Sequence, residues 1–315
     1  AALPAGPPPV PIGPEDAAVV FTTSGTTGAP RCAVVEHRNL LAAHRGWREA
    51  YHLSPADRVL STASLEFDVF TADWVRALCS GATLVVAPRN LTLDRSADIA
   101  DLPALVAAER ITLLELNVRT ARRLTAHLAA TGGDGGGVAG PGDGGDVARL
   151  PGLRLLTVGA EKWWLDEHLA LQRLLGPGTR VVNVYGLAEA AVDSTYFEVH
   201  SLDEPPGDRS ESVVGVPFAG TRVYVLGPDG TPAAGGTIGE IALAGPGLGP
   251  GYLGRPGETA RRFARAAFDP DGRVLLTGDL GRLAADGTLR FVGRAATVVG
   301  PDQRPRAASV VAKVT

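Results

Sequence analysis

The sequence has few of the residues that build disulfide frameworks and metal sites. Its 315 residues include two cysteines, Cys32 and Cys79, six histidines and no methionine. The two cysteines form no Cys-x-x-Cys pair and have no histidine pattern beside them, which argues against a disulfide framework or a zinc site. None of the histidines falls in a recognisable motif, so we predict none of them as a base or ligand.

Long apolar runs and blocks of like charge are also missing. The net charge is -4 and the Lys and Arg residues are scattered, so nothing predicts a nucleic-acid partner. No apolar run approaches membrane-spanning length, and the Pro-rich start lacks the pattern of a signal peptide. With 45% hydrophobic residues and a mean hydropathy of +0.09, the composition is typical of globular proteins. We expect a cytoplasmic enzyme or enzyme fragment with no membrane partner.

Strand-like and helix-like segments alternate along the first two thirds of the chain. This alternation predicts crossover units on a largely parallel sheet, and hence an α/β fold. The predicted strands cover residues 17–21, 58–62, 83–87, 111–116, 153–158 and 181–184, and the predicted helices cover 38–50, 72–80, 98–109, 119–130 and 165–175.

The texture changes near residue 192, where Gly, Pro and Asp begin to separate short strands. We therefore divide the chain into a Pro-rich linker (1–16), an α/β core (17–191), a smaller β-rich subdomain (192–300) and a tail that starts a hinge (301–315). Within the core, residues 131–146 are so rich in glycine that they predict a flexible surface insertion. Strands are predicted in the second part at residues 222–226, 237–243, 274–276 and 289–292.

One local motif predicts a phosphate site. The segment Phe21-Thr-Thr-Ser-Gly-Thr-Thr-Gly-Ala-Pro-Arg31 ends a strand with hydroxyls and glycines, whose side chains and backbone N–H groups can surround phosphate oxygens. It is not a Walker loop, because no Gly-Lys-Ser/Thr follows. Alone it is equally typical of a flexible Ser/Gly turn. The candidate phosphate contacts are Thr23, Ser24, Gly25, Thr26, Thr27 and Gly28.

Three further motifs follow this loop in a fixed order. They are Asn183-Val-Tyr-Gly-Leu-Ala-Glu189, then Gly239-Glu-Ile-Ala-Leu-Ala-Gly-Pro-Gly-Leu248 with Gly251-Tyr-Leu, then Thr277-Gly-Asp279 with Gly293-Arg294. Together the four resemble the adenylate-forming, AMP-binding superfamily, and within it the amino-acid adenylation domains of nonribosomal peptide synthetases. The resemblance implies the large N-terminal core of such an enzyme, with parallel sheets flanked by helices and a smaller β-rich subdomain that carries the ribose-binding motif.

The resemblance also implies a nucleotide site. Tyr185 would stack on adenine, Asp279 would accept both ribose hydroxyls, and Arg294 would approach the ribose or a phosphate. Each has an ordinary alternative: a half-buried core tyrosine, a turn aspartate or a surface arginine. The implied nucleotide contacts are Asn183, Tyr185, Gly186, Asp279 and Arg294, and Glu189 would hold the magnesium ion of MgATP.

An amino-acid pocket is implied by Phe67-Asp68 and the helix that follows. Asp68 matches the aspartate that anchors a substrate α-ammonium group. The other implied pocket residues are Val69, Ala72, Glu115, Leu156, Val158, Val184, Val192 and Asp193. Six of these eight are apolar, and two lone carboxylates among them would require a cation. Glu115 and Asp193 therefore predict a basic, ornithine-like substrate. The alternative is that Glu115 merely ends a strand in solvent.

In this family the substrate carboxylate attacks the α-phosphorus of ATP, pyrophosphate leaves, and the acyl adenylate awaits the phosphopantetheine thiol of a carrier protein. We therefore expect an amino acid, ATP and Mg²⁺, a peptidyl carrier protein and neighbouring synthetase domains as ligands and partners. An acyl-CoA or aryl-acid ligase is a weaker alternative, because Asp68 argues for an α-amino acid.

The sequence departs from the family pattern at several motifs. Ala188 replaces a threonine, Arg31-Cys32 replaces Lys-Gly, Gly249-Pro250 replaces Ala-Arg, and Ala296 replaces the hinge aspartate. The chain also ends near that hinge, so we expect the mobile C-terminal subdomain and its catalytic lysine to be absent. These losses predict weak nucleotide binding. They leave open a degenerate domain, retained as a scaffold in the synthetase and without activating function.

Overall fold

Five parallel strands form one half of the main sheet. The computed structural model describes residues 11–23, 30–89, 98–131, 150–202 and 208–295. In it the strands lie in the order β4-β3-β5-β6-β7, which confirms the predicted parallel sheet. Their bounds are β3 Arg58–Ser61, β4 Thr83–Val86, β5 Leu113–Asn117, β6 Leu155–Gly159 and β7 Arg180–Tyr185.

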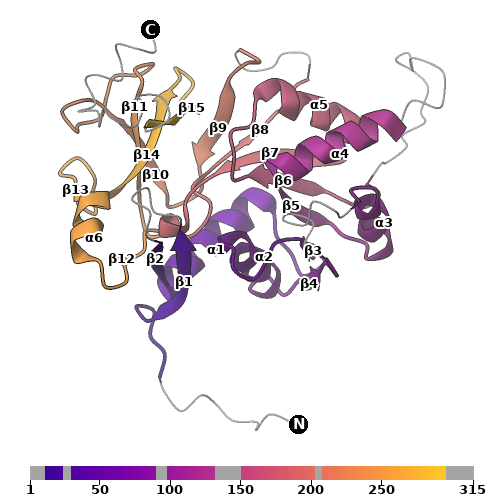
Figure 1. Ribbon diagram of the computed structural model, residues 1–315, viewed down its shortest axis with the longest axis horizontal. Helices are drawn as coiled ribbons and strands as arrows, with labels where there is room; N and C mark the ends of the chain where they lie inside the picture. Colours follow the sequence, from indigo (N-terminus) through magenta and orange to yellow (C-terminus); the bar gives the residue numbers. More distant parts are fainter. Residues whose placement is uncertain (1–10, 24–29, 90–97, 132–149, 203–207, 296–315) are drawn as a thin grey trace.

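Helices cover both faces of this half. Figure 1 shows α4 and α5 on one side of the parallel strands and α1 and α2 on the other. The helices extend over α1 His37–Tyr51, α2 Asp68–Leu78, α3 Asp101–Ala108, α4 Val118–Thr131 and α5 Leu165–Leu175. Each overlaps a predicted helix, although α2 begins four residues earlier than predicted. Among the described residues, no helix is long and apolar enough to cross a membrane.

The same sheet continues from β7 into an antiparallel half. Its order is β7-β8-β9-β15-β14-β11-β10, with β13 on β14, while β1, β2 and β12 form a small second sheet. The remaining bounds are β1 Ala17–Thr23, β2 Arg31–Glu36, η1 Ala188–Ala190, β8 Thr195–Glu198, β9 Ser212–Pro217, β10 Arg222–Leu226, β11 Gly239–Ala244, β12 Gly251–Tyr252, α6 Pro256–Arg262, β13 Phe263–Arg265, β14 Arg273–Leu283 and β15 Leu289–Arg294.

This architecture confirms the predicted α/β class with a β-rich second part. The sheet crosses the boundary proposed at residue 192 without a break, so the division into domains there stays a prediction. Residues 1–10, most of the Gly-rich insertion, the phosphate loop from Ser24 to Gly28 and the tail at 301–315 lie outside the described residues.

Two hydrophobic clusters pack against opposite faces of the parallel strands. Because side chains alternate along a strand, neighbouring residues of β6 belong to different clusters. Leu155 packs with residues of α1 and α2, and Leu156 with residues of α3, α4 and α5. The side chains that share the face of Leu155 lie on the same side as Trp47 and Tyr51 of α1, and this face carries the candidate substrate site.

His168 of α5 is a buried histidine with a structural role. Its Nε2 lies 2.8 Å from the carbonyl oxygen of Val181, and its ring stacks on Trp163 with centroids 4.6 Å apart. The side chain is 1% exposed, and burial lowers its pKa from 6.5 to about 4. The imidazole is therefore neutral in the folded protein at any pH above about 4.

This burial predicts an acid sensitivity that can be traced to one residue. Between about pH 6.5 and pH 4 the unfolded chain binds a proton at His168 that the folded chain does not. The free energy of unfolding should therefore fall as pH falls through this window, and less steeply in His168→Gln, which retains a donor for Val181. Denaturant titrations at several pH values measure the slopes, with the exposed His200→Gln as control. Equal slopes for wild type and His168→Gln would contradict this account.

Candidate active site

A set of charged side chains converges at one end of the parallel strands. Asp68 begins α2, Glu115 lies in β5, and Glu189 and Asp193 follow β7. The charges of Glu115 and Glu189 both act on Asp68, and those of Asp68 and Glu115 act on Asp193. The structure thus brings together carboxylates that lie up to 125 residues apart (Asp68 to Asp193), as the family resemblance implied.

Arg76 of α2 lies at the centre of this set. Its guanidinium is completely buried and donates to Glu115 through one terminal nitrogen and to Asp193 through the other. Glu115 is itself 5% exposed, so the alternative that it ends a strand in solvent is wrong. The two carboxylates are already paired inside the chain. Arg76 therefore supplies the cation that the prediction of an ornithine-like substrate assigned to the ligand.

Further groups surround the guanidinium. Asp73 Oδ1 lies 3.8 Å from it, and the rings of Trp47 and Tyr51 lie 4.5 and 5.6 Å from its central carbon. Burial alone would lower the pKa of Arg76, but Glu115 and Asp193 raise it above its ordinary value. The arginine is therefore a permanent cation.

The carboxylates around Arg76 exceed it in number. Asp73, Glu115 and Asp193 are three acidic groups beside one guanidinium. Burial and the charge of Glu115 raise the pKa of both Asp73 and Asp193. Desolvation in a protein interior thus opposes the simultaneous ionisation of all three acidic groups.

The remaining predicted pocket residues fall on both faces of the sheet. Ala72, Val184 and Val192 pack in the cluster with Trp47 and Tyr51, close to the charged set, and Val69 is half-buried at the start of α2. Leu156 and Val158 pack in the opposite cluster, with α3, α4 and α5.

The prediction that Leu156 and Val158 face the same pocket as Glu115 is therefore contradicted by the structure. The reason is strand alternation, since a one-residue offset moves a side chain to the other face. The β6 residue on the side of Glu115 is Thr157, its register partner, whose hydroxyl donates to Glu115 Oε2 at 3.2 Å.

Two negative charges, those of Glu115 and Glu189, act on Asp68. Burial, followed by the charge of Glu115, raises its pKa from 3.8 to about 6. Backbone N–H groups at the start of α2 partly offset this shift. Among the described residues, this half-buried carboxylate forms no ion pair, so an ammonium group would be stabilised beside it.

Residues predicted to bind the nucleoside meet where β7 approaches β14 and β15. Tyr185 donates from its hydroxyl to Asp279 Oδ2 at 2.9 Å, and Arg294 Nε lies 2.9 Å from Asp279 Oδ1. Asp279 is 2% exposed, and burial raises its pKa. Tyr185, Asp279 and Arg294 thus form one group, in which both oxygens of the predicted ribose acceptor already contact side chains of the chain.

Glu189, the predicted magnesium ligand, lies in η1 beside β12. Its Oε1 accepts a hydrogen bond from the Tyr252 hydroxyl at 2.7 Å, and the side chain is 5% exposed. Arg31, which follows the predicted phosphate loop, pairs with Glu258 at 2.6 Å and lies over the Tyr252 ring at 5.5 Å. The cation at the end of that loop is therefore bound to a carboxylate of α6.

A single carboxylate fits a magnesium ion that binds mainly to ATP phosphates and water. Among the residues that the structure describes, no group of three or more His, Cys, Asp or Glu side chains could hold a metal ion. Glu189 keeps one oxygen besides the one that accepts from Tyr252. It can supply a hard anionic ligand, while the phosphates would have to supply the rest.

Two other residues of the β7 motif have structural contacts. The amide of Asn183 donates to the carbonyl oxygen of Val213 at 2.6 Å, which fastens β7 to the antiparallel half of the sheet. A Cβ on Gly186 would lie 1.9 Å from the carbonyl oxygen of Val192, so only glycine fits there. Val192 has a φ of 78°, an unfavourable value for a β-branched residue. This tight loop places Asp193 beside Arg76.

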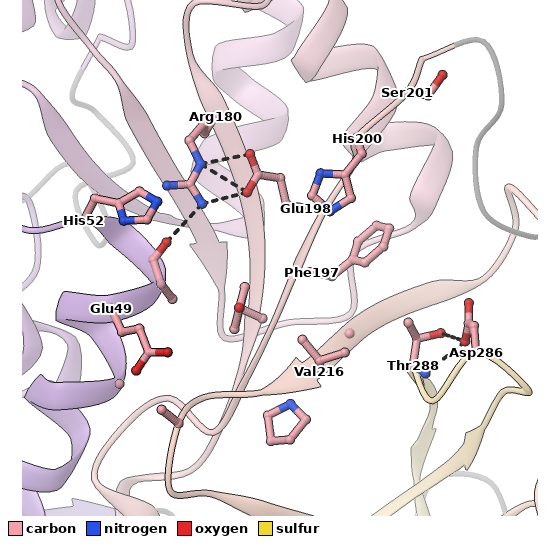
Figure 2. Close-up of a pocket in the computed structure, with 16 residues that line it drawn as sticks. Glu49, His52, Arg180, Phe197, Glu198, His200, Ser201, Val216, Asp286 and Thr288 are labelled. Atoms are coloured by element: carbon pink, nitrogen blue, oxygen red, sulfur yellow. Dashed lines mark hydrogen bonds and ion pairs between the residues drawn. The ribbon is translucent and has the colours of Figure 1, made fainter.

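The site is separate from a cavity of about 800 Å³ between the end of α1 and strands β7, β8 and β9. Figure 2 shows Arg180 and Glu198 joined across its wall, with Glu49, His52 and His200 nearby. Among the described residues, none that was predicted to bind nucleotide, metal or amino acid lines it. We therefore assign no step of a reaction to this cavity.

The sequence contained a signal for Arg76, but the motifs used to predict the pocket do not include this residue. Asp68, Ala72 and Arg76 are spaced four residues apart, so they share one face of a helix. Ala72 was predicted to face the pocket, and Arg76 one turn later faces it too. The contacts of Trp47, Tyr51, Asp73 and Thr157 depend on packing between distant elements, and no motif marks them.

Comparison with known proteins agrees with the fold and with the predicted family. A protein family described as "AMP-binding enzyme" matches residues 2–253. The chain belongs to this family. The chain is 33% identical over 284 residues to bacitracin synthase 2 of Bacillus licheniformis and 31% identical over 287 residues to gramicidin S synthase 2 of Brevibacillus brevis. Its relatives are the adenylation modules of nonribosomal peptide synthetases, as the motifs predicted.

Solved structures resemble this member of the AMP-binding family over nearly its whole length. CmiS6 gives a TM-score of 0.75 at 29% identity, covering 93% of this chain and 64% of that one. The nonribosomal peptide synthetase FmoA3 gives 0.75 at 31% identity, covering 92% and 28%. The two synthases are each matched over 89% of this chain, which spans 10% of the first and 6% of the second.

The contact between Tyr252 and Glu189 predicts a stability effect. Tyr252→Phe leaves a buried carboxylate oxygen without its donor, which should lower the free energy of unfolding by about 1–3 kcal/mol. The matched control is Tyr224→Phe, which removes a similar bond to Asp269, a carboxylate that Arg222 also holds. Urea denaturation measures both. If Tyr252→Phe lowers the free energy of unfolding no more than the control does, this contact is not an important source of stability.

Proposed function

We propose that this chain is the substrate- and nucleotide-binding core of an amino-acid adenylation domain. The observation that carries the proposal is Asp68, a half-buried carboxylate whose pKa is raised by burial and by the charges of Glu115 and Glu189, at the strand ends where α/β folds bind ligands. An α-ammonium group would supply the missing cation. An acyl-CoA or aryl-acid substrate has no such group, so Asp68 argues against those ligase classes.

The nucleotide would bind beside the amino acid. Tyr185 offers a half-buried aromatic ring for the adenine, and Asp279 offers carboxylate oxygens for the ribose hydroxyls if Tyr185 and Arg294 yield part of their contacts. Glu189 would hold the magnesium ion, which neutralises phosphate charge when bound. The phosphate-loop residues Ser24 to Gly28 remain a prediction from the sequence.

The expected chemistry is an adenylyl transfer. A carboxylate oxygen of the amino acid forms a bond to the α-phosphorus, the bond from that phosphorus to the bridging oxygen breaks, and pyrophosphate leaves with the electron pair. The protein contributes by positioning the two reactants and stabilising charge on the phosphoryl oxygens. A carrier-protein thiol and neighbouring synthetase domains would then receive the acyl group, as we expect from the family.

The structure removes the physical reason for predicting an ornithine-like substrate. It required two carboxylates without a partner, and Arg76 is the partner of both. The proposed substrate is an α-amino acid, with its ammonium group at Asp68.

A second candidate is a domain that holds synthetase modules together without activating an amino acid. It is favoured by the contacts of Arg31, whose charge is bound to Glu258 rather than left free for a phosphate, and by the alanine at position 188. ATP–pyrophosphate exchange on the intact natural protein, with a panel of amino acids, separates the two. Exchange with any amino acid supports activation, and its absence together with absent binding of aminoacyl-adenylate analogues supports the scaffold.

The pKa of Asp68 gives this proposal a pH dependence. A folded-state pKa near 6 means that the carboxylate is mostly ionised only above pH 6. Above this pH its negative charge lowers the free energy of unfolding of the ligand-free protein, and the same charge attracts an ammonium ligand. Binding of a non-hydrolysable aminoacyl-adenylate analogue should therefore strengthen as pH rises through about 6. In Asp68→Asn it should be weaker by roughly tenfold or more and show no such rise.

Calorimetry from pH 5 to 8 measures both effects. The control is Glu66→Gln, which neutralises an exposed carboxylate two residues away. If Asp68→Asn binds the analogue as well as wild type does across this range, Asp68 is not the ammonium anchor.

A further inference from the structure

The predicted amino-acid pocket contains a cation that belongs to the protein itself. Arg76 is 0% exposed, and its two terminal nitrogens bind the carboxylates of Glu115 and Asp193, on β5 and on the loop after η1. Neither carboxylate comes from α2, so the arginine joins three separate parts of the fold. If these two carboxylates selected a basic substrate, the ammonium or guanidinium group of its side chain would bind between them in the same way.

The position of Arg76 relative to Asp68 follows from the helix. The two residues lie eight positions apart on one face of α2, with Ala72 between them, which corresponds to about 12 Å along the axis. An amino acid whose ammonium group binds Asp68 therefore directs its side chain along a face that begins with a methyl group and ends at a guanidinium. The aromatic rings of Trp47 and Tyr51 support that guanidinium from α1.

We propose that Arg76 determines substrate specificity, because it occupies the place of a basic side chain between Glu115 and Asp193 and so selects amino acids with uncharged side chains. The inference rests on the proposed function, since it names the class of amino acid that Asp68 anchors. A basic substrate would bring a second cation toward a permanent one, and it could approach Glu115 or Asp193 only by displacing the guanidinium from a buried ion pair.

The inference predicts a change of specificity on removing one residue. Arg76→Met keeps a long side chain but leaves Glu115 and Asp193 unpaired, so a basic ligand can take the vacated place. Ornithine should then bind better than valine, where wild type prefers valine. Arg76→Lys keeps a cation and should keep the preference for valine. In the triple variant Arg76→Met, Glu115→Gln, Asp193→Asn no anion remains for the ligand, and the gain for ornithine should disappear.

The experiment uses the full chain and the non-hydrolysable sulfamoyl-adenosine analogues of ornithine and valine, with dissociation constants from calorimetry. The ratio of the two constants should change on the order of 100-fold between wild type and Arg76→Met, in favour of ornithine. A wild type that prefers the ornithine analogue, or an Arg76→Met that keeps the wild-type ratio, overturns the inference.

Arg76→Met contains two buried anions without a partner, so its folding is a second readout. If it does not fold alone, free ornithine at millimolar concentration should restore a cooperative thermal transition that free valine does not restore. Failure of ornithine to restore it would contradict the inference. If neither analogue binds wild type but ornithine restores the thermal transition of Arg76→Met, the proposed amino-acid activation is wrong. The inference that a cation belongs between Glu115 and Asp193 is then still supported. If wild type binds both analogues equally, activation stands and the role of Arg76 fails.

Discussion

The ion pairs of Arg76 with Glu115 and Asp193 are the interaction on which the account of this site depends. A charge in a protein interior is stable only with partners that replace its hydration, and here each side chain depends on the others. Arg76 comes from α2, Glu115 from the middle of β5, and Asp193 from the loop that leads into β8. The pairing therefore fixes how a helix, a parallel strand and the first antiparallel connection lie relative to one another.

The rest of the site is arranged around this constraint. The tight loop after β7, with its close contact of Gly186 to Val192, places Asp193 against the guanidinium. The start of the same helix presents Asp68, which forms no ion pair among the described residues. One helix thus carries a paired arginine and, two turns earlier, a carboxylate without an ion pair in the described part of the chain. This difference is the basis of the proposed substrate, an amino acid whose side chain carries no positive charge.

Much of the fold could be predicted from the sequence, because its parallel half follows simple patterns. Five strands and five helices alternate, and each helix and strand predicted there is found. Strand β2 was missed because its apolar run between Arg31 and Glu36 is short. Strand β14 was predicted at three of its eleven residues because Thr277-Gly-Asp279 resembles a turn. That segment instead belongs to the strand that presents Asp279 to Tyr185.

The site was predicted less completely than the fold, for physical reasons. Motif order gave Asp68, Tyr185, Glu189 and Asp279 as candidates, since these belong to short local patterns. The face of Leu156 depends on strand register, which a motif does not give, and the partner of Glu115 depends on packing across 39 residues. When a sequence predicts a buried carboxylate, a cation elsewhere in the chain should be considered as its partner before a ligand is. Here the helix spacing from Ala72 would have identified Arg76.

The most direct test of the account is an experimental structure of the chain with a non-hydrolysable valyl-adenylate analogue. We expect the ligand ammonium within hydrogen-bonding distance of the Asp68 carboxylate, with Arg76 still between Glu115 and Asp193. The same crystals soaked with the ornithine analogue provide the contrasting case. An ornithine side chain bound between Glu115 and Asp193, with Arg76 turned away from both, would contradict the account.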